Sequence, residues 1–318
     1  MAKKYLFDLS VASSALLQVN PKEFYAKTLL SDRSTSLFRQ MVNVKEKTKV
    51  ANVLFADVLQ EADCDFAATN QNLSAKEMEP CKFNIGVELC QWDLESSFLA
   101  DWMKAGSAPG DFMSGGNMAA FATHFYDQLS KKVNEELEIL TFQGDTGGAT
   151  STYLDLCDGL EKQLAFETEL GDRRIVGTTI TSSNVVAQLT LAYNQIPKAL
   201  RKKKGEILWL ISPEVADAYR LAVATASAET YVVKDAELKF LGYSLTVAEG
   251  ISDNVMIVSL KNNFIFLTDL VSDQDAIQTI DMSKTTGDRK IRALGSFKFG
   301  VNYVNPSEFV TYGIAAQS

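Results

Sequence analysis

The stretch 117–142, with the sequence NMAAFATHFYDQLSKKVNEELEILTF, decides the fold of this 318-residue chain. Its apolar residues recur every three or four positions, which is the spacing of one face of an α-helix. That face consists of Met118, Phe121, Phe125, Leu129, Val133, Leu137 and Leu140. At the usual rise per residue the helix would be about 39 Å long, more than twice the mean globular helix. Its charged residues make it too polar to span a membrane, so we expect a long helix whose apolar face packs against a β-sheet.

The composition limits the classes of protein that the chain can be. A hydrophobic content of 46% with 22% charged residues is typical of a globular chain with a sizeable core. The net charge of −9 argues against a dedicated DNA-binding protein, which would need a basic face. The N-terminus has no sustained hydrophobic stretch, so we expect neither a signal peptide nor a membrane anchor.

The cysteines contain no CxxC pair, and we expect reduced thiols that fill apolar space. They are Cys64, Cys81, Cys90 and Cys157.

The first ninety residues are predicted to form an arm and a long hairpin. Residues 1–42 have no strong period and would contain short helices over 22–30 and 35–42. Residues 47–66 suggest one strand, the polar stretch NQNLSAKEM (70–78) a tip, and the alternating stretch CKFNIGVELCQWDL (81–94) the returning strand. A two-stranded hairpin is marginal in water by itself, so we expect another subunit to cover it.

The segment that joins the hairpin to the long helix is predicted to be a helix followed by a joint. The helix covers 93–104 with Asp93 in the capping position, and the flexible joint covers 105–116.

Beyond the long helix, residues 151–250 alternate between strand and helix, which predicts a compact α/β domain. The expected strands cover 173–180, 206–212 and 238–250, the last with a kink at Gly242. The expected helices cover 184–203 and the stretch after Ser212, an N-cap followed by Pro213 at the first helical position.

The tail, 251–318, is predicted to be β-structure that returns to the long helix. Asn262 and Asn263 mark a turn between its first two strands. The closing strand alternates Phe297, Phe299, Val301 and Tyr303 and ends at Asn305 and Pro306.

This order of arm, hairpin, long helix, inserted α/β domain and returning strands resembles the major capsid protein of tailed phages, with its Hong Kong 97-like fold. The stretches that carry the resemblance run in the same order as in that family. They are CKFNIGVELCQWDLESSFLAD (81–101), EELEILTFQGDTGGATSTYLDL (135–156), ILWLISPEVADAYRLA (207–222), LKFLGYSLTVAEGISDNVMIVSLKNNFIFLTD (238–269) and RALGSFKFGVNYVNPSEFVTY (292–312).

The resemblance implies an α+β fold with an N-arm, an E-loop hairpin, a P domain and an inserted A domain. These would cover residues 1–42 (N-arm), 43–92 (E-loop), 93–150 with 251–318 (P domain, including a spine helix over 117–142) and 151–250 (A domain).

The function it implies is that of a structural subunit, not an enzyme. The subunit would self-assemble into an icosahedral shell around the double-stranded DNA of a tailed phage, located in the virion and assembled in the host cytoplasm. Its partners would be its own copies in hexamers and pentamers, a portal protein and, non-specifically, packaged DNA, with no membrane. The resemblance implies a separate scaffolding protein or none, and the use of a scaffolding protein or decoration proteins stays open. The alternative is an encapsulin-type shell, a bacterial compartment loaded with enzyme cargo.

No residue is predicted to be catalytic or to hold a cofactor or metal. Asp145-Thr146-Gly147 matches the aspartic-protease tripeptide, but that chemistry needs two aspartates sharing a proton, and the tripeptide occurs once. A glycine-rich exit from the long helix is favoured. His124, the single histidine, has no second histidine or carboxylate cluster beside it in sequence and is expected to pack on the helix surface or at an interface.

The basic run Lys198–Lys204 is expected at a helix C-terminus, where cations complement the helix dipole. Contact of this run with an acidic neighbour or with packaged DNA stays open, as does DNA contact by Lys3 and Lys4.

Some members of the family join a lysine of the E-loop to an asparagine of a neighbouring subunit. The residues that could do so here are Lys76 and Lys82 with Asn254, Asn262 and Asn263. Such pairs arise by chance in any chain, so crosslinking is not favoured.

Overall fold

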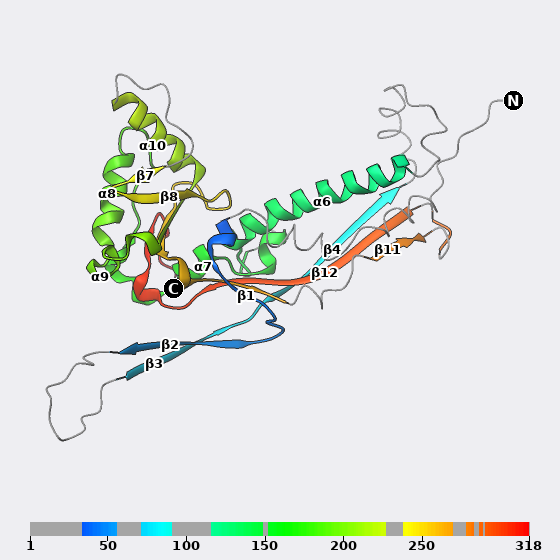
Figure 1. The fold of residues 1–318 in the computed structure, drawn as a ribbon, viewed down its shortest axis with the longest axis horizontal. Helices are drawn as coiled ribbons and strands as arrows, with labels where there is room; N and C mark the ends of the chain where they lie inside the picture. Colours follow the sequence, from blue (N-terminus) through cyan, green and yellow to red (C-terminus); the bar gives the residue numbers. More distant parts are fainter. Residues whose placement is uncertain are drawn as a thin grey trace. The chain divides into compact units, whose positions relative to one another are not determined.

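The computed structural model describes residues 34–55, 71–90, 116–148, 152–226, 238–269, 278–282, 286–288 and 290–317 (Figure 1). They fall in two compact units. The smaller unit takes its described residues from the segments 82–136 and 269–298, and the larger unit takes its own from 32–81, 137–268 and 299–318. The expected helices over 22–30 and 93–104 and most of the joint 105–116 lie outside the described residues.

The long helix is confirmed as α6, Gly116–Gln143. Leu137 and Leu140, in its last turns, are buried as the apolar face predicts. Phe142 is fully buried, and its ring contacts the edge of Phe38, which in turn stacks on Phe264 of β10 (Phe264–Thr268). In the larger unit, the end of α6 therefore packs on a strand of the returning tail through an aromatic residue from the N-terminal segment.

Among the described residues, five strands belong to the first sheet, in which β12 pairs with β10, β11 and β4. They are β1 (Arg39–Met41), β10, β12 (Lys290–Tyr303), β11 (Gln278–Asp281) and β4 (Cys81–Cys90). The expected closing strand is confirmed, since Phe297, Phe299, Val301 and Tyr303 of β12 are all buried. In the smaller unit Glu88 of β4 accepts hydrogen bonds from Lys290 and Arg292 of β12. The prediction of a helix over 35–42 was wrong, because this segment forms a 3-10 turn, η1 (Ser34–Leu37), followed by strand β1.

The hairpin differs from its expected form. Strands β2 (Thr48–Phe55) and β3 (Gln71–Met78) pair antiparallel from Thr48 opposite Met78 to Phe55 opposite Gln71. The stretch expected as a polar tip is thus the returning strand, and the expected returning strand is β4, which pairs with β12. Around Ala75 and Glu77 strand β3 is exposed, so it lacks the apolar alternation by which strands are recognised. Its pairing includes an ion pair between Lys49 and Glu77, directly opposite each other at 2.9 Å.

A six-stranded sheet with flanking helices makes up the α/β part of the larger unit. The strand order is β5 (Arg174–Ile175), β13 (Val310–Tyr312), β9 (Met256–Leu260), β6 (Ile207–Ile211), β8 (Tyr243–Val247) and β7 (Lys239–Phe240). The helices are α7 (Leu160–Ala165), α8 (Val185–Gln195), α9 (Lys198–Arg201) and α10 (Pro213–Ala226). The 3-10 turns are η3 (Tyr153–Leu156), η4 (Thr168–Arg173), η5 (Lys204–Glu206), η6 (Lys261–Asn263) and η8 (Pro306–Glu308). Trp209 of β6 is fully buried at the centre of this core.

Three local expectations in this part need correction. The helix expected over 184–203 is divided into α8 and α9, because Pro197 cannot continue a helix from α8. The expected kink at Gly242 is a tight turn between β7 and β8, in which Leu241 and Gly242 have φ of 50° and 82°. The strand expected over 173–180 is much shorter in the structure, where only Arg174–Ile175 form strand β5. The N-cap is confirmed, since Ser212 Oγ accepts from the backbone N–H of Val215 at 3.4 Å.

The tail divides its strands between the two sheets. β9 and β13 pair within the α/β sheet, so the boundary expected between 250 and 251 separates strands of one sheet. The expected turn at Asn262 and Asn263 is present, but it carries the chain from β9 into β10 of the other sheet. Asn263 is buried, donates to Ser259 Oγ and to the carbonyl of Asn305, and accepts from the N–H of Asn305 at 2.7 Å. Its side chain therefore fixes this crossover.

Candidate functional site: the junction after helix α6

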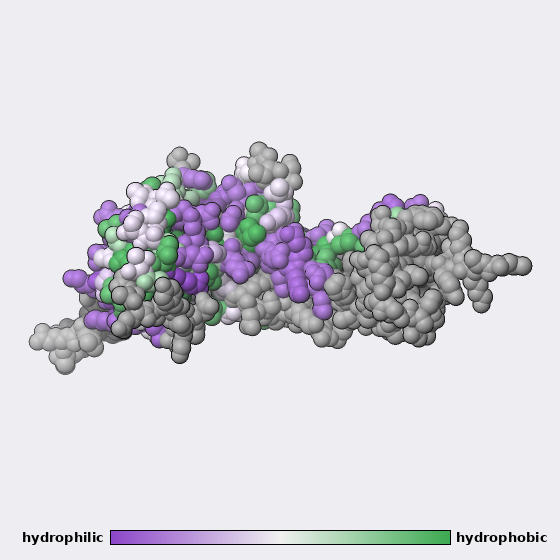
Figure 2. Space-filling model, turned by 90° about the horizontal axis from the view of Figure 1, so that it is seen from above, coloured by the Kyte–Doolittle hydropathy of each residue, from purple (hydrophilic) through white to green (hydrophobic). Residues whose placement is uncertain are grey.

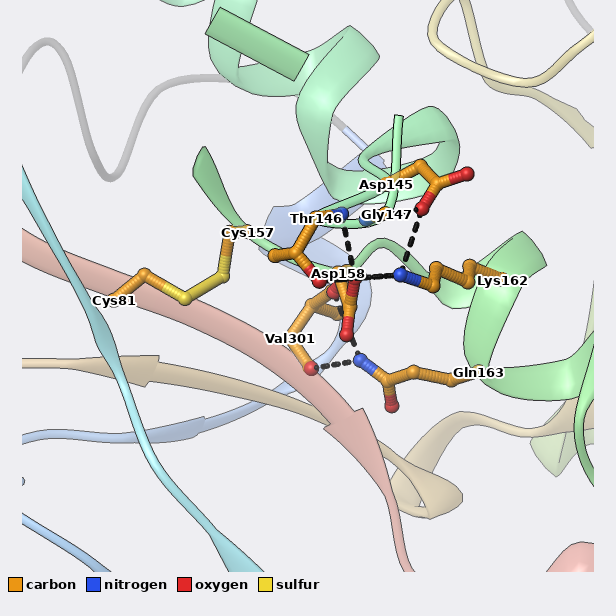
Figure 3. Close-up of polar contacts among 9 residues, drawn as sticks. All are labelled: Cys81, Asp145, Thr146, Gly147, Cys157, Asp158, Lys162, Gln163 and Val301. Carbon is orange, nitrogen blue, oxygen red and sulfur yellow. Dashed lines mark hydrogen bonds and ion pairs between the residues drawn. A yellow bond between two sulfur atoms is a disulfide. The ribbon is translucent and has the colours of Figure 1, made fainter. Parts of the chain in front are cut away.

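The loop that follows α6 is the centre of a polar cluster in the larger unit (Figure 3). Lys162 of α7 places its Nζ 2.7 Å from Oδ1 of Asp145 and 2.7 Å from Oδ1 of Asp158. The same Asp158 oxygen accepts from the backbone N–H and the hydroxyl of Thr146. Asp145 also accepts from the N–H of Gly147 at 2.8 Å. The loop is thereby closed by one lysine between two carboxylates.

The electrostatics of this cluster keep all three groups charged. Burial opposes the charge on Lys162, but the hydrogen bonds that it donates to Asp145 and Asp158 outweigh burial and raise the pKa of the lysine. The hydrogen bond from Lys162, and then that from Gly147, lowers the pKa of Asp145. Burial works against ionisation of Asp158, yet Lys162 and Thr146 lower the pKa of this carboxyl as well. Two ionised aspartates bridged by an ammonium do not share a proton, so the cluster has the character of a structural lock rather than an aspartic-protease dyad.

Side chains of α7 tie this loop to strand β12 and to the segment after β8. Gln163 donates from one amide nitrogen to the carbonyls of Asp158 and Val301, the latter in β12, both at 2.9 Å (Figure 3). Glu161 accepts from the N–H and the hydroxyl of Ser252, at 2.8 and 2.7 Å. Burial raises the pKa of Glu161, although the bonds from Ser252 oppose this. The helix exit, β12 and the segment after β8 are therefore held by one short helix.

A disulfide joins Cys81 and Cys157, with a Cα–Cα distance of 5.9 Å (Figure 3). The expectation of reduced thiols was wrong for this pair, because folding brings together residues 76 positions apart in sequence. Cys90 is a free thiol, and Cys64 lies outside the described residues. Cys81 directly follows the corner between β3 and β4, so the bridge connects the base of the hairpin to the loop before α7.

Beside the disulfide lies a pocket of about 630 Å³. It is lined by Lys76, Glu79, Cys81, Thr146, Cys157, Asp158, Lys162, Gln163, Phe166, Glu167, Asn302 and Tyr303. Lys76 of β3 places its Nζ 3.0 Å from the ring centroid of Tyr303, whose hydroxyl donates to Glu167 at 2.7 Å. Burial lowers the pKa of Lys76 to about 8, although Glu167 opposes this. The hairpin base is thus attached to β12 by a cation–π contact and to the loop before α7 by the disulfide.

The other residues singled out in the sequence are not part of this junction. His124 lies in α6, with its side chain outside the described residues. Arg201, from the basic run, donates to the carbonyls of Tyr193, Asn194 and Ile196 at the end of α8, which agrees with the expected role at a helix C-terminus.

Two of the asparagines considered for crosslinking hold backbone instead. Asn263 fixes the crossover described above, and Asn254 accepts from the N–H of Ile180 at 2.6 Å. Asn262 and Lys82 are exposed, and Lys3 and Lys4 lie outside the described residues.

Sequence reasoning identified the loop 144–148 but missed its partners. Asp158 and Lys162 stand four residues apart, but Asp158 precedes the first residue of α7, so the spacing alone did not mark a pair on one helix. The remaining contacts join segments far apart in the sequence, so no local pattern predicts them. They are those of Gln163 with Val301, of Cys81 with Cys157 and of Lys76 with Tyr303.

Replacing Lys162 by methionine is expected to lower the free energy of unfolding by about 1–2 kcal/mol near pH 7, because two carboxylates lose their shared partner. The lowered pKa values of Asp145 and Asp158 mean that their stabilisation is complete above the unfolded pKa, about 4, and is lost as the pH falls through the folded pKa values. The difference between the two proteins should therefore shrink below about pH 4. Denaturant unfolding at several pH values measures this difference in the free energy of unfolding, and Lys202→Met, at an exposed lysine, is the control. A difference that is unchanged in acid would contradict the ionic lock.

Comparison with known proteins places the fold. No protein-family model matches the sequence, and no curated protein matches it. A chain of the satellite phage P4 procapsid is similar in structure, with a TM-score of 0.58 at 9% identity over 93% of this chain and 98% of that one. The capsid of the native GTA particle gives a TM-score of 0.54 at 11% identity over 91% of both chains. The SrpI encapsulin complex from Synechococcus elongatus gives 0.52 at 10% identity over 99% of this chain and 92% of that one. The mixed helix-and-strand fold is therefore that of phage capsid structures, as predicted from the order of the elements, and an encapsulin shares it.

Proposed function

We propose that this chain is the major capsid subunit of a tailed phage and self-assembles into an icosahedral shell around its double-stranded DNA. The observation that carries the proposal is the match in fold to capsid chains over more than nine tenths of their length and of this one. These neighbours are components of particles rather than enzymes. The polar cluster after α6, with its paired and ionised groups, suits a rigid structural element.

The hairpin supports assembly through exchange of segments between subunits. Among the described residues, β2 and β3 pair only with each other. Their base is buried on one face, because Val50 and Met78 pack with Ile265 and Leu267. Ala51 and Ala75, the next pair along the ribbon, are exposed. Such a ribbon is stable only when something else covers it. The hairpin of one subunit lies across the long helix of its neighbour, and the N-arm over 1–42 contacts the next.

The surface supports the same mode of association. Among the coloured residues of the face seen in Figure 2, hydrophobic residues are interspersed with hydrophilic ones rather than gathered in one broad patch. Large apolar side chains such as Val176 and Leu221 are exposed in the described part of the chain, and scattered exposed apolar residues are ordinary on soluble proteins. Subunit contacts therefore depend on extended segments and on repeated heterologous contacts that close by rotation.

The partners follow from this function. Copies form hexamers and pentamers, the A domain over 151–250 meets its counterparts around the symmetry axes, and a portal protein occupies one vertex. Packaged DNA is contacted without sequence preference, and a separate scaffolding protein and decoration proteins are candidate partners. The subunit is assembled in the host cytoplasm and resides in the virion. None of the helices in the described part of the chain is both long and apolar enough to cross a bilayer.

An encapsulin-type shell is the second candidate, and the similarity to the SrpI complex favours it specifically. Expression of the chain with and without a co-expressed scaffolding protein, followed by electron microscopy, tests both candidates for closed particles. Nuclease-protected double-stranded DNA inside particles from infected cells is expected for the capsid, and protein cargo for the encapsulin. Soluble monomers under every condition would contradict both.

A further inference from the structure

The disulfide between Cys81 and Cys157 lies where the direction of the hairpin is set. Cys81 is the first residue of β4, and Pro80 before it is buried at the corner that β3 and β4 share. The corner is closely packed, since a side chain at Gly300 of β12 would meet the Pro80 Cα at 3.2 Å. A covalent bond at this corner limits how the hairpin can turn relative to the loop that contains Cys157.

The two halves of the bridge are each held by other contacts. The hairpin base is seated by the apolar cluster that contains Val50 and Met78 and by the cation–π contact of Lys76 with Tyr303. The Cys157 loop is held by Asp158 with Lys162, and by the hydrogen bond from the Gly159 N–H to the Gly144 carbonyl at 2.8 Å. Opening the bridge therefore removes a constraint between two segments that are already folded.

Both cysteines line the pocket of about 630 Å³, whose rim includes the half-exposed ring of Phe166. Cys81 is half-buried and Cys157 is buried, so a small thiol or disulfide that enters this pocket meets Cys81 first. A partly exposed cysteine such as Cys81 is the one that exchanges with the surrounding redox pool, and the buried Cys157 reacts next with the mixed disulfide.

We propose that Cys81 and Cys157 form a redox-controlled latch on the hairpin, open in a reducing cell and closed by oxidation after the shell has left it. The proposal rests on the proposed function, because a shell that is assembled in the cytoplasm and then leaves the cell passes from reducing to oxidising surroundings. Disulfides are rare in a reducing cytoplasm and persist outside it. The open latch lets the hairpin adjust its direction during assembly, and the closed latch fixes the direction in the finished shell.

The closing step is a thiol–disulfide exchange with a small-molecule disulfide such as oxidised glutathione. The thiolate of one cysteine attacks that disulfide, which forms a mixed disulfide and releases one glutathione thiolate. The thiolate of the second cysteine then attacks the protein sulfur of the mixed disulfide and displaces the second glutathione. The two protons of the cysteine thiols end on glutathione, and the two electrons of the oxidation reduce it.

The test uses the full-length chain, expressed in a reducing cytoplasm and treated with an alkylating agent during lysis so that free thiols are blocked. Peptide mass spectrometry is expected to find both Cys81 and Cys157 alkylated. Unblocked protein treated with oxidised glutathione should acquire the bridge, and its unfolding temperature should rise by roughly 5–10 °C. Cys81→Ser and Cys157→Ser should show no rise, and Cys90→Ser, the matched control, should behave like wild type.

Two results would overturn the latch: a complete bridge in protein blocked at lysis, or an unfolding temperature that oxidation leaves unchanged. Because these readouts need only the soluble full-length chain, they decide the latch even if no particles form. The absence of particles from wild type and from all variants would instead contradict the proposed shell.

Discussion

A chain in which residues 51–75 are replaced by Asn-Gly is expected to fold as a stable subunit and to form no closed shells. The substitution keeps the pairs of Thr48 with Met78 and of Val50 with Lys76, and Asn-Gly is the preferred two-residue turn between antiparallel strands. The buried base and the contact of Lys76 with Tyr303 also remain. The shortened chain therefore loses only the part of the ribbon that needs cover from another subunit.

Electron microscopy and sedimentation measure the loss of shells, and circular dichroism with thermal unfolding checks the subunit. An unfolding temperature within a few degrees of that of the wild-type subunit, together with absent shells, is the expected pair of results. Normal shells from the shortened chain would show that the ribbon is not the clasp between subunits. A shortened chain that does not fold would show that the ribbon belongs to the core of its own subunit.

Replacing Gly250 by alanine is expected to lower the free energy of unfolding by about 3 kcal/mol. A Cβ at Gly250 would lie 2.0 Å from the carbonyl oxygen of Glu138 in α6, a backbone atom that cannot move aside without shifting the helix. The same segment is held to α6 by the hydrogen bond from Gln143 to the Gly250 carbonyl, at 2.8 Å. The substitution should therefore separate the segment after β8 from the helix.

Gly205 provides the matched control. It lies in η5, where a Cβ would have no neighbouring atom within 4 Å, so Gly205→Ala should be neutral or slightly stabilising. Denaturant unfolding of the two alanine variants compares the same chemical change in a closed and in an open position. Equal effects would show that α6 and the segment after β8 are not packed as described.

Much of the fold followed from periodic patterns. The three-and-four spacing of apolar residues predicted α6 to within a residue at each end, and strict alternation predicted the buried face of β12. Ser212 and Pro213 predicted the start of α10, because a cap satisfies backbone groups within a few residues of itself. These signals are local, because a helix or strand that is buried on one face has apolar residues at regular positions in its own sequence.

Strand β3 and the separation of α8 from α9 show where that reasoning fails. Gln71–Met78 is a strand because its backbone pairs with β2. Its residues are largely polar, so the sequence shows no alternation of apolar and polar positions that would predict a strand. Pro197 was present in the expected helix over 184–203 and should have ended it, since the turn chemistry of a single residue outweighs the apolar period around it.

The sequence by itself determined the long helix, the alternating closing strand and the order of elements that predicted a capsid fold, since each depends on residues close together in the chain. Only the tertiary structure decided that Cys81 meets Cys157, that Lys162 bridges Asp145 and Asp158, and that β9 and β13 join the α/β sheet. The physical reason is that these contacts join segments far apart in the chain. Their residue types suit many partners, and only packing of the whole unit selects one.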